Sequence, residues 1–314
     1  MNVCLTVDVE TYSGDYDRDV YGEGLGLPFI LDTCRRHGLA ATFFVETLGA
    51  TRWGMAGVQR ICEDLNSAGQ DIQLHIHPVV AQVEWVSDRY DVLWMHDEPT
   101  QKRLIELGRR ILADCTGRPV EAFRVGDFAA NRDTLTAMDH LGILVGSNRD
   151  LDTKCSTRSQ LNEVFPIRND VSRLGRIVDL PTSAFRSPLR FLDGPYRHMQ
   201  VNALGTGEMT DALVRMERAG YACATILTHP GEYFRASGGR LVPIWKNCRR
   251  LERLLDFLIA HPSMPVRIVR DCAGTELGCL VSPPELRLSL GWALYRVWEQ
   301  SLDRVRRRMG RRGF

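Results

Sequence analysis

The chain has 314 residues, of which 44% are hydrophobic and 25% charged, so it is long enough for one large α/β domain or for two small ones. Its formal net charge of +1 excludes a strong overall positive potential of the kind that attracts nucleic acid. A charged partner would therefore have to be recognised by a local patch of charged residues. Nine cysteines, an odd number without CxxC spacing, indicate reduced thiols in a cytoplasmic protein. The N-terminus MNVCLTVDVE lacks the basic start of a signal peptide, and no apolar run approaches the roughly 20 residues of a membrane span.

Short apolar runs alternate along the chain with segments of helical periodicity. The runs that predict strands are 3–7, 41–45, 72–75, 122–124, 143–145, 177–180, 224–227 and 266–269. The segments that predict helices are 27–37, 57–68, 100–116, 132–141, 209–219 and 246–260. Strands that alternate with helices indicate a parallel sheet. About seven strands in a chain of this length fit a (β/α) barrel better than an open sheet.

Polar residues stand where several of the predicted strands end. They are Asp8, Glu10, His75, His77, Arg124 and His229. In a (β/α) barrel, the loops that follow the strands gather at one end and carry the functional residues. We therefore expect these six side chains at one end of the barrel, with the long loops 12–26 and 231–239 shaping a substrate site.

Two pairs of these residues have the two-residue spacing that places side chains on one face of a strand. Asp8 and Glu10 form the first pair, which alone is equally compatible with two solvated carboxylates. His75 and His77 form the second, and imidazole suits Zn²⁺ and related first-row metals. The pattern predicts a metal site made of both histidines and one of the two carboxylates, with coordination positions left open as in catalytic sites.

Four short segments, in this order, resemble the successive motifs of the polysaccharide deacetylases, the NodB-homology or carbohydrate esterase 4 group. They are TVDVE at 6–10, DIQLHIHP at 71–78, FRVGD at 123–127 and ILTHP at 226–230. The match spans about residues 1–272. The resemblance implies a deformed (β/α) barrel of about seven strands that hydrolyses an N-acetyl or N-formyl amide of an amino sugar with the help of a divalent metal.

The resemblance also implies a role for each matched residue. Asp8 corresponds to the general base, Arg124 to the arginine that orients it, and His229 to the general acid. The implied metal ligands are Glu10, His75 and His77. Glu10 stands where a second aspartate directly after the first is usual, and the two histidines are separated by two residues instead of four.

The implied cofactor is Zn²⁺, with Co, Fe, Mn or Ni as alternatives. An aspartate and a tryptophan that tune the acidic histidine in the family have no evident counterpart, and Asp150 and Asp179 are the candidates for the aspartate. A backbone N–H near 126–127 is expected to stabilise the oxyanion of the tetrahedral intermediate.

The expected substrate is an amino-sugar glycan or a lipid-linked sugar of glycan or envelope biosynthesis. Two alternatives stay open. The first is an allantoinase-like hydrolase of a small amide. The second is a non-catalytic carbohydrate-binding barrel, which would be expected to have lost one of the base, metal or acid positions. The sugar, the acyl group and the oligomeric state are left open.

Residues 276–314 are predicted to form a segment distinct from the catalytic unit 1–275. Its apolar stripe consists of Leu290, Leu294, Val297, Trp298, Leu302, Val305 and Met309, flanked by Trp292 and Tyr295. The other, solvated face carries the basic residues Arg296, Arg304, Arg306, Arg307 and Arg308, followed by Arg311 and Arg312. The pattern predicts an amphipathic helix that docks on an anionic membrane at its inner face. The alternative is a last helix packed on the barrel with a solvated basic tail.

Overall fold

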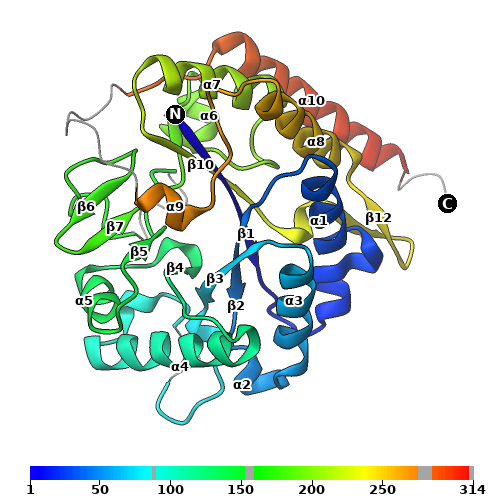
Figure 1. Ribbon diagram of the computed structural model, residues 1–314. Helices are drawn as coiled ribbons and strands as arrows, with labels where there is room; N and C mark the ends of the chain where they lie inside the picture. Colours follow the sequence, from blue (N-terminus) through cyan, green and yellow to red (C-terminus); the bar gives the residue numbers. More distant parts are fainter. Residues whose placement is uncertain (87–89, 153–158, 275–284, 311–314) are drawn as a thin grey trace.

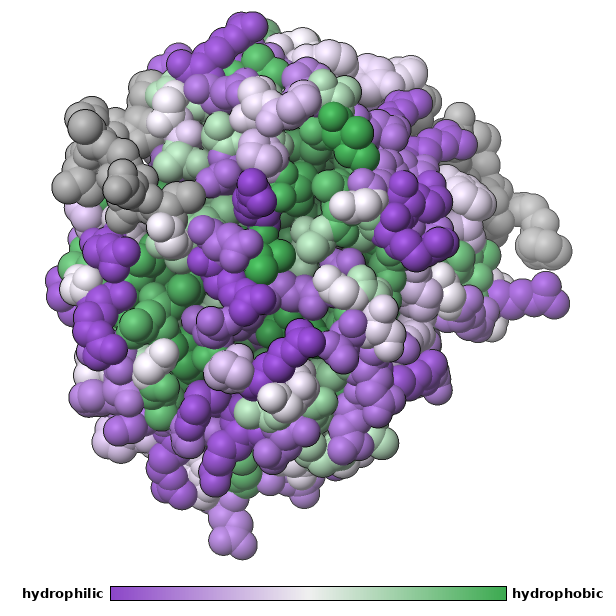
Figure 2. Space-filling view, in the orientation of Figure 1, coloured by the Kyte–Doolittle hydropathy of each residue, from purple (hydrophilic) through white to green (hydrophobic). Residues whose placement is uncertain are grey.

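The computed structural model describes the backbone of residues 1–86, 90–152, 159–274 and 285–310, and the side chains of these residues except Asp193 and 302–310. In Figure 1 the strands pass through the centre of the molecule and the helices surround them. On the face shown in Figure 2, hydrophilic residues are interspersed with smaller hydrophobic areas.

Ten α-helices lie in the described part of the chain. They are α1 Leu27–Arg36, α2 Ala50–Trp53, α3 Ala56–Ser67, α4 Glu98–Thr116, α5 Arg132–His140, α6 Arg190–Asp193, α7 Thr206–Arg218, α8 Trp245–Ile259, α9 Val269–Ala273 and α10 Leu290–Gly310. The sequence sets their ends: Asp97 caps α4 by accepting the Thr100 N–H at 3.0 Å, and Gly117 ends it with φ of 65°.

The main sheet, within the described residues, has eight strands in the order β10-β1-β2-β3-β4-β5-β7-β6. They are β1 Asn2–Val9, β2 Thr42–Glu46, β3 Asp71–Ile76, β4 Ala122–Val125, β5 Val145–Gly146, β6 Ser172–Leu174, β7 Ile177–Asp179 and β10 Cys223–Thr228. All neighbours pair in parallel except β6 and β7. This curled, mostly parallel sheet confirms the predicted deformed (β/α) barrel.

Two small hairpins complete the strands. One pairs β8 Ala184–Arg186 with β9 Tyr196–His198, and the other pairs β11 Phe234–Ser237 with β12 Arg240–Pro243. The chain after β9 covers the free edge of β10, because the Leu227 N–H donates to the Met199 carbonyl at 2.9 Å. The sequence did not reveal these hairpins, since strands of three or four residues carry too little periodicity.

The side chains of β1 alternate between two environments. The odd-numbered residues from Val3 to Val9 pack in the core between the sheet and the helices. The even-numbered residues Cys4, Thr6 and Asp8 are also buried, on the inner face of the curled sheet. β1 is thus buried on both faces, and its inner face carries Cys4 near its start and Asp8 near its end.

The predicted last strand at 266–269 is wrong. Val266 forms only an isolated bridge with Val3, and α9 begins at Val269. The Val269 N–H donates to the side-chain hydroxyl of Thr42 at 2.9 Å and not to a backbone carbonyl of a neighbouring strand. The pairing with β1 therefore ends before Val269. The short helix α9 lies against β1, close to the start of the strand.

Candidate active site

The parallel register brings the predicted functional residues to one end of the barrel. Glu10 directly follows β1, His77 follows β3, and His229 follows β10. His75 and Arg124 are register partners within β3 and β4. Residues separated by more than 200 positions in the sequence therefore face one another.

Three of these side chains form a ligand cluster. Glu10 Oε2 lies 2.8 Å from His77 Nε2 and 3.2 Å from His75 Nε2. Ligand atoms of Glu10, His75 and His77 all lie within 4.8 Å of one another. Ligands at about 2.0–2.1 Å around a tetrahedral Zn²⁺ stand roughly 3.3–3.4 Å apart, so this nitrogen and oxygen set fits such an ion. Between the two carboxylates that the sequence left open, it is Glu10 that joins the histidines.

The two imidazoles are held by partners on their other nitrogens. His75 Nδ1 lies 2.8 Å from the Arg124 carbonyl, which accepts its proton and leaves Nε2 free to bind a metal. His77 Nδ1 lies 3.1 Å from Asp91 Oδ1, the carboxylate–histidine arrangement that commonly supports metal ligands. The sequence analysis missed Asp91, because it lies in a long loop where no periodicity or motif marks it.

The carboxylates around His77 create a negative field. Burial alone would lower the pKa of His77, but the charge of Glu10 and the contact with Asp91 raise it to about 10. Burial alone would raise the pKa of Glu10. The charge of His77 and the hydrogen bonds of both histidines nevertheless hold this pKa well below its usual range. The cluster therefore attracts positive charge, whether a proton or a metal cation.

Gly126 permits the position of the His77 ring. A Cβ atom at Gly126 would lie 2.2 Å from His77 Cε1, far inside van der Waals contact. Next to it, Asp127 and Phe128 adopt φ values of 54° and 57°, which L-residues rarely adopt. The turn after β4 thus brings its backbone directly against a metal-site imidazole, in the segment where the sequence predicted an oxyanion donor.

This close approach gives the first prediction. We expect Gly126→Ala to displace His77 and to weaken metal binding by at least about 10-fold, the lower end of the effect of disturbing a ligand's support. Gly205→Ala is the matched control, since the nearest atom would lie 3.8 Å from its Cβ. Metal affinity is measured by competition with a chromophoric chelator. Equal affinities in the two variants would contradict the proposed constraint.

Asp8 and Arg124 form an ion pair inside the barrel. Arg124 Nη1 donates to Asp8 Oδ1 at 2.6 Å, and both residues are buried. The same guanidinium donates to the hydroxyls of Thr6 at 3.0 Å and Ser147 at 2.7 Å. A planar donor fixed at several points holds the carboxylate in one orientation. Ser147 was not predicted, because it directly follows the strand β5, which is only two residues long.

His229 stands on the other side of Asp8 and has its own carboxylate partner. His229 Nδ1 lies 2.8 Å from Glu232 Oε1, and its Nε2 lies 4.0 Å from Asp8 Oδ2. Burial alone would lower the pKa of His229, but the hydrogen bond and charge of Glu232, together with the charges of Glu10 and Asp8, raise it to about 9. An imidazole kept protonated at neutral pH is suited to donate a proton.

Neither aspartate that the sequence suggested as the partner of His229 contacts it. Asp179 instead accepts from Arg149 Nε at 2.7 Å, while Asp150 binds His198 Nδ1 at 2.7 Å. The partner is Glu232, three residues after His229 on the short helical turn Pro230–Glu232. Because this turn begins directly after the strand, its third residue lies beside the histidine. A comparison of motifs alone does not reveal this contact.

The pairing of His229 with Glu232 gives the second prediction. We expect the protonated imidazole to act as the acid, so that activity is lost as the pH rises through the pKa of His229. We expect Glu232→Gln to remove the charge that raises this pKa and to move the basic limb of the kcat/KM profile down by roughly one to three pH units. An unchanged basic limb would show that another group sets it. Glu252→Gln, on the outer helix α8 with its carboxylate on Arg36, is the control.

An open pocket of about 320 Å³ lies over Glu10 and His229. Its wall consists of Glu10, Thr11, Tyr12, Ser13, Asp19, His229, Pro230 and Gly231. Tyr12 is half exposed, and its hydroxyl lies 3.0 Å from His77 Nδ1. The loop that follows β1 therefore joins the ligand cluster to the solvent.

Solved structures resemble this chain over most of its length. A protein from Mycobacterium smegmatis identified as a polysaccharide deacetylase has a TM-score of 0.58 and 17% identity, covering 87% of this chain and 88% of its own. A family 4 carbohydrate esterase from Streptomyces lividans, in complex with acetate, has a TM-score of 0.47 and 15% identity, covering 90% and 98%. A CE4 family pseudoenzyme from Bacillus anthracis has a TM-score of 0.46 and 12% identity, covering 87% and 65%.

The first of these similarities shows that the chain has the NodB-like fold of the polysaccharide deacetylases, as its four motifs predicted. At the level of sequence, no family model and no curated protein matches the chain. The fold carries no chemistry by itself, so the activity must be argued from the site.

Proposed function

We propose that this protein is a metal-dependent hydrolase that removes an N-acetyl or N-formyl group from an amino sugar. The observation that carries the proposal is the convergence of three groups within one end of the barrel. They are the ligand cluster Glu10, His75 and His77, the buried pair of Asp8 with Arg124, and the pair of His229 with Glu232. A base, an acid and a ligand set are the parts that hydrolysis of an unactivated amide requires.

The cluster would hold a divalent cation, preferably Zn²⁺, which when bound supplies Lewis-acid activation of the water and of the amide carbonyl. Asp8 accepts a proton from the attacking water, and Arg124 keeps the carboxylate oriented. His229 donates a proton to the nitrogen of the leaving amine, and Glu232 holds the imidazole by its other nitrogen. The amide and water thus become a carboxylic acid and the amine of the sugar.

The test is release of acetate or formate from a panel of N-acylated sugars, including nucleotide sugars and polyprenyl-linked sugars. We expect release from at least one of them by the Zn²⁺-loaded enzyme, loss of release after chelation, and recovery when Zn²⁺ is restored. Hydrolysis of allantoin without release from any sugar would favour the small-amide alternative. Sugar binding without release would favour a non-catalytic barrel and overturn the proposal.

The exposed surface of α10 is relevant to where in the cell the enzyme would encounter its substrate. In the described residues, no helix is long and apolar enough to cross a membrane. Four large apolar side chains of α10 are nevertheless at least half exposed, namely Leu290, Leu294, Tyr295 and Trp298. Their spacing places them on one stripe of the helix, and aromatic rings of this kind suit a membrane interface.

The opposite side of α10 packs on the barrel. Ala293 is fully buried, and Arg296 donates to Glu208 of α7 with 2.9 Å between Nε and Oε2. The prediction that Arg296 lies on the solvated basic face is therefore wrong, since tertiary contact with a buried carboxylate decides its position. The predicted residues Leu302, Val305 and Met309 and the later arginines lie outside the described side chains.

We propose that the exposed stripe of α10 docks the enzyme on an anionic membrane, where a lipid-linked sugar would be presented. The arginines that follow in the sequence at 304 and 306–308 would each add about 1 kcal/mol near anionic headgroups. This placement at the inner face of a cytoplasmic membrane rests on the sequence and on the exposed stripe.

Sedimentation with vesicles gives the third prediction. We expect binding to anionic but not to neutral vesicles, reduced at least about 10-fold in the double variant Tyr295→Ala/Trp298→Ala, because the two rings together contribute at least about 1.4 kcal/mol when buried in lipid. Trp245→Ala is the control, since this tryptophan on α8 is 64% exposed. Wild-type protein that ignores anionic vesicles at low salt would contradict membrane docking.

A further inference from the structure

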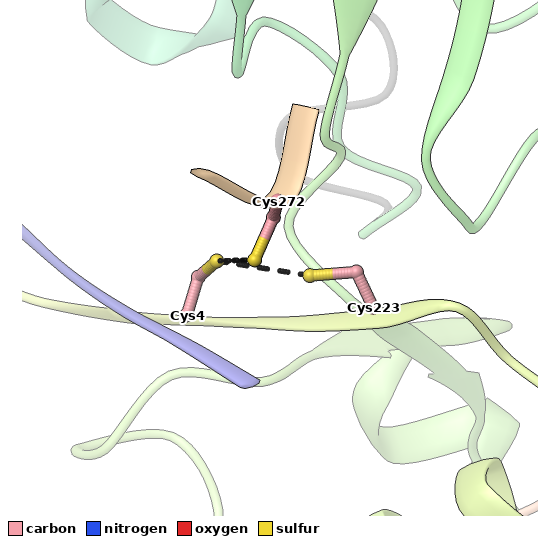
Figure 3. A group of neighbouring side chains, drawn as sticks. All are labelled: Cys4, Cys223 and Cys272. Atoms are coloured by element: carbon pink, nitrogen blue, oxygen red, sulfur yellow. Dashed lines mark hydrogen bonds between the residues drawn. The ribbon is translucent and has the colours of Figure 1, made fainter. Parts of the chain in front are cut away.

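Three cysteines from distant parts of the sequence meet inside the barrel. Cys4 lies in β1, Cys223 begins β10, and Cys272 lies in α9. Cys4 Sγ lies 3.2 Å from Cys272 Sγ and 3.7 Å from Cys223 Sγ, and the three sulfurs all lie within 4.8 Å of one another. Figure 3 shows the three side chains pointing toward one another from their separate elements.

The thiol cluster, as we call Cys4, Cys223 and Cys272, is separate from the candidate active site. Cys4 lies near the start of β1 and Glu10 directly follows the strand, six residues further on, which corresponds to about 20 Å along a strand. The cluster is therefore at the opposite end of the barrel, where α9 covers the start of β1.

The surroundings of the thiol cluster are buried and apolar. All three cysteines are at most 5% exposed. Their packing neighbours include Phe44, Val171, Val178, Leu180 and Val269. The nearby carboxylate of Asp170 is occupied by backbone donors, since it accepts from the N–H groups of Val171, Ala222 and Cys223 at 2.7–3.0 Å.

We propose that the thiol cluster binds a thiophilic monovalent d¹⁰ cation, with Cu(I) as the occupant, and ties α9 to β1 and β10. Three sulfurs at about 2.3 Å from a common centre stand roughly 3.8–4.0 Å apart. The 3.7 Å between Cys4 and Cys223 is close to this separation, and the 3.2 Å between Cys4 and Cys272 would have to widen on binding. Soft thiolates select Cu(I), zinc and iron–sulfur centres among metals. Structural zinc takes four ligands, whereas the cluster within the described residues offers three, which suits a three-coordinate Cu(I) ion.

The proposed role is structural. Binding releases thiol protons to the solvent and places one cation between the paired strands β1 and β10 and the short helix α9. An ion that binds the folded chain and not the unfolded one raises the midpoint of thermal unfolding, by a free energy that grows with the logarithm of the ion concentration over its Kd.

The test uses Cu(I) itself, supplied without oxygen as its coloured bicinchoninate complex. We expect the wild-type protein to remove one equivalent of Cu(I) from the complex and to unfold at a higher temperature afterwards. Cys4→Ala, Cys223→Ala and Cys272→Ala should each reduce the transfer to the level of a buffer blank. Alanine is chosen because it leaves no unpaired polar group in this apolar site.

Four single-cysteine variants serve as matched controls. Cys34→Ala and Cys62→Ala remove buried thiols outside the cluster, and Cys155→Ala and Cys279→Ala remove thiols that lie outside the described residues. All four should transfer copper as the wild type does. Equal loss of transfer in these controls, or full transfer in the cluster variants, would overturn the proposal.

X-ray absorption at the copper edge makes the test independent of whether the variants fold. For wild-type protein we expect three sulfur neighbours at about 2.3 Å and no nitrogen. Nitrogen neighbours would place the copper on His75 and His77 and would overturn the assignment. Preference of the cluster for Zn²⁺ over Cu(I), or absence of any transfer, would do the same.

Discussion

His77→Ala is expected to lose its metal and its turnover while the barrel stays folded. The imidazole contributes Nε2 to the ligand cluster, 2.8 Å from Glu10 Oε2, and removing it leaves only His75 and Glu10. Removal of a residue that only supports a metal ligand typically lowers metal affinity by about 10–100-fold. Removal of the ligand itself should lower it further. The same result is expected for His75→Ala.

The measurement is metal content after loading with one equivalent of Zn²⁺, read together with far-ultraviolet circular dichroism to confirm folding. His140→Ala is the control, because this histidine lies on the outer surface at the end of α5, with its side chain 54% exposed. Full occupancy in His77→Ala would remove this residue from the ligand set. Retained turnover without metal would overturn the metal-dependent mechanism.

Asp8→Asn should lower kcat by about 10²–10⁴ while the metal stays bound, because an amide cannot accept the proton of the attacking water. Asparagine is preferred to alanine for a structural reason. Its carbonyl can still accept from Arg124 Nη1, whereas alanine would leave a buried guanidinium without its anion at a cost of about 3–5 kcal/mol in folding. With asparagine, a decrease in kcat therefore reports the loss of the base and not a loss of folding stability.

His229→Ala is the companion variant, and we expect a decrease in kcat of the same order through loss of the proton donor. The readout that separates the two roles is a substrate with a better leaving group. An activated amide or ester needs little protonation of its leaving group, so it should restore turnover in His229→Ala much more than in Asp8→Asn. Equal recovery in both variants would contradict the assigned roles of base and acid.

Much of the barrel could be predicted from sequence because its strands and helices have different periods. The long helices α4 and α8 begin and end within two residues of their predicted bounds, since caps and apolar stripes mark them locally. The short strands β6, β8 and β9 could not be predicted, because their sequences SRL, AFR and YRH form no apolar run, unlike that of β7. The segment at 266–269 looked like a strand, yet its pairing with β1 is limited to the bridge at Val266, and the Val269 N–H donates to the Thr42 hydroxyl.

The candidate site divides in a similar way. The two-residue spacing of Asp8 with Glu10 and of His75 with His77 predicted which faces they share, because this follows from strand geometry alone. The sequence could not decide which carboxylate meets the histidines, and tertiary structure decides it by placing Arg124 beside Asp8.

What the sequence by itself determined was the set of residues at the ends of the strands and the kind of fold that gathers them. Only the tertiary structure decided their partners, such as Asp91 for His77, Glu232 for His229 and Glu208 for Arg296. It also brought together the three thiols of the thiol cluster, of which Cys4 and Cys223 are 219 residues apart in the sequence. The physical reason is that periodicity reports the direction of a side chain from its own backbone, whereas a partner is fixed by distances between segments that only packing brings together.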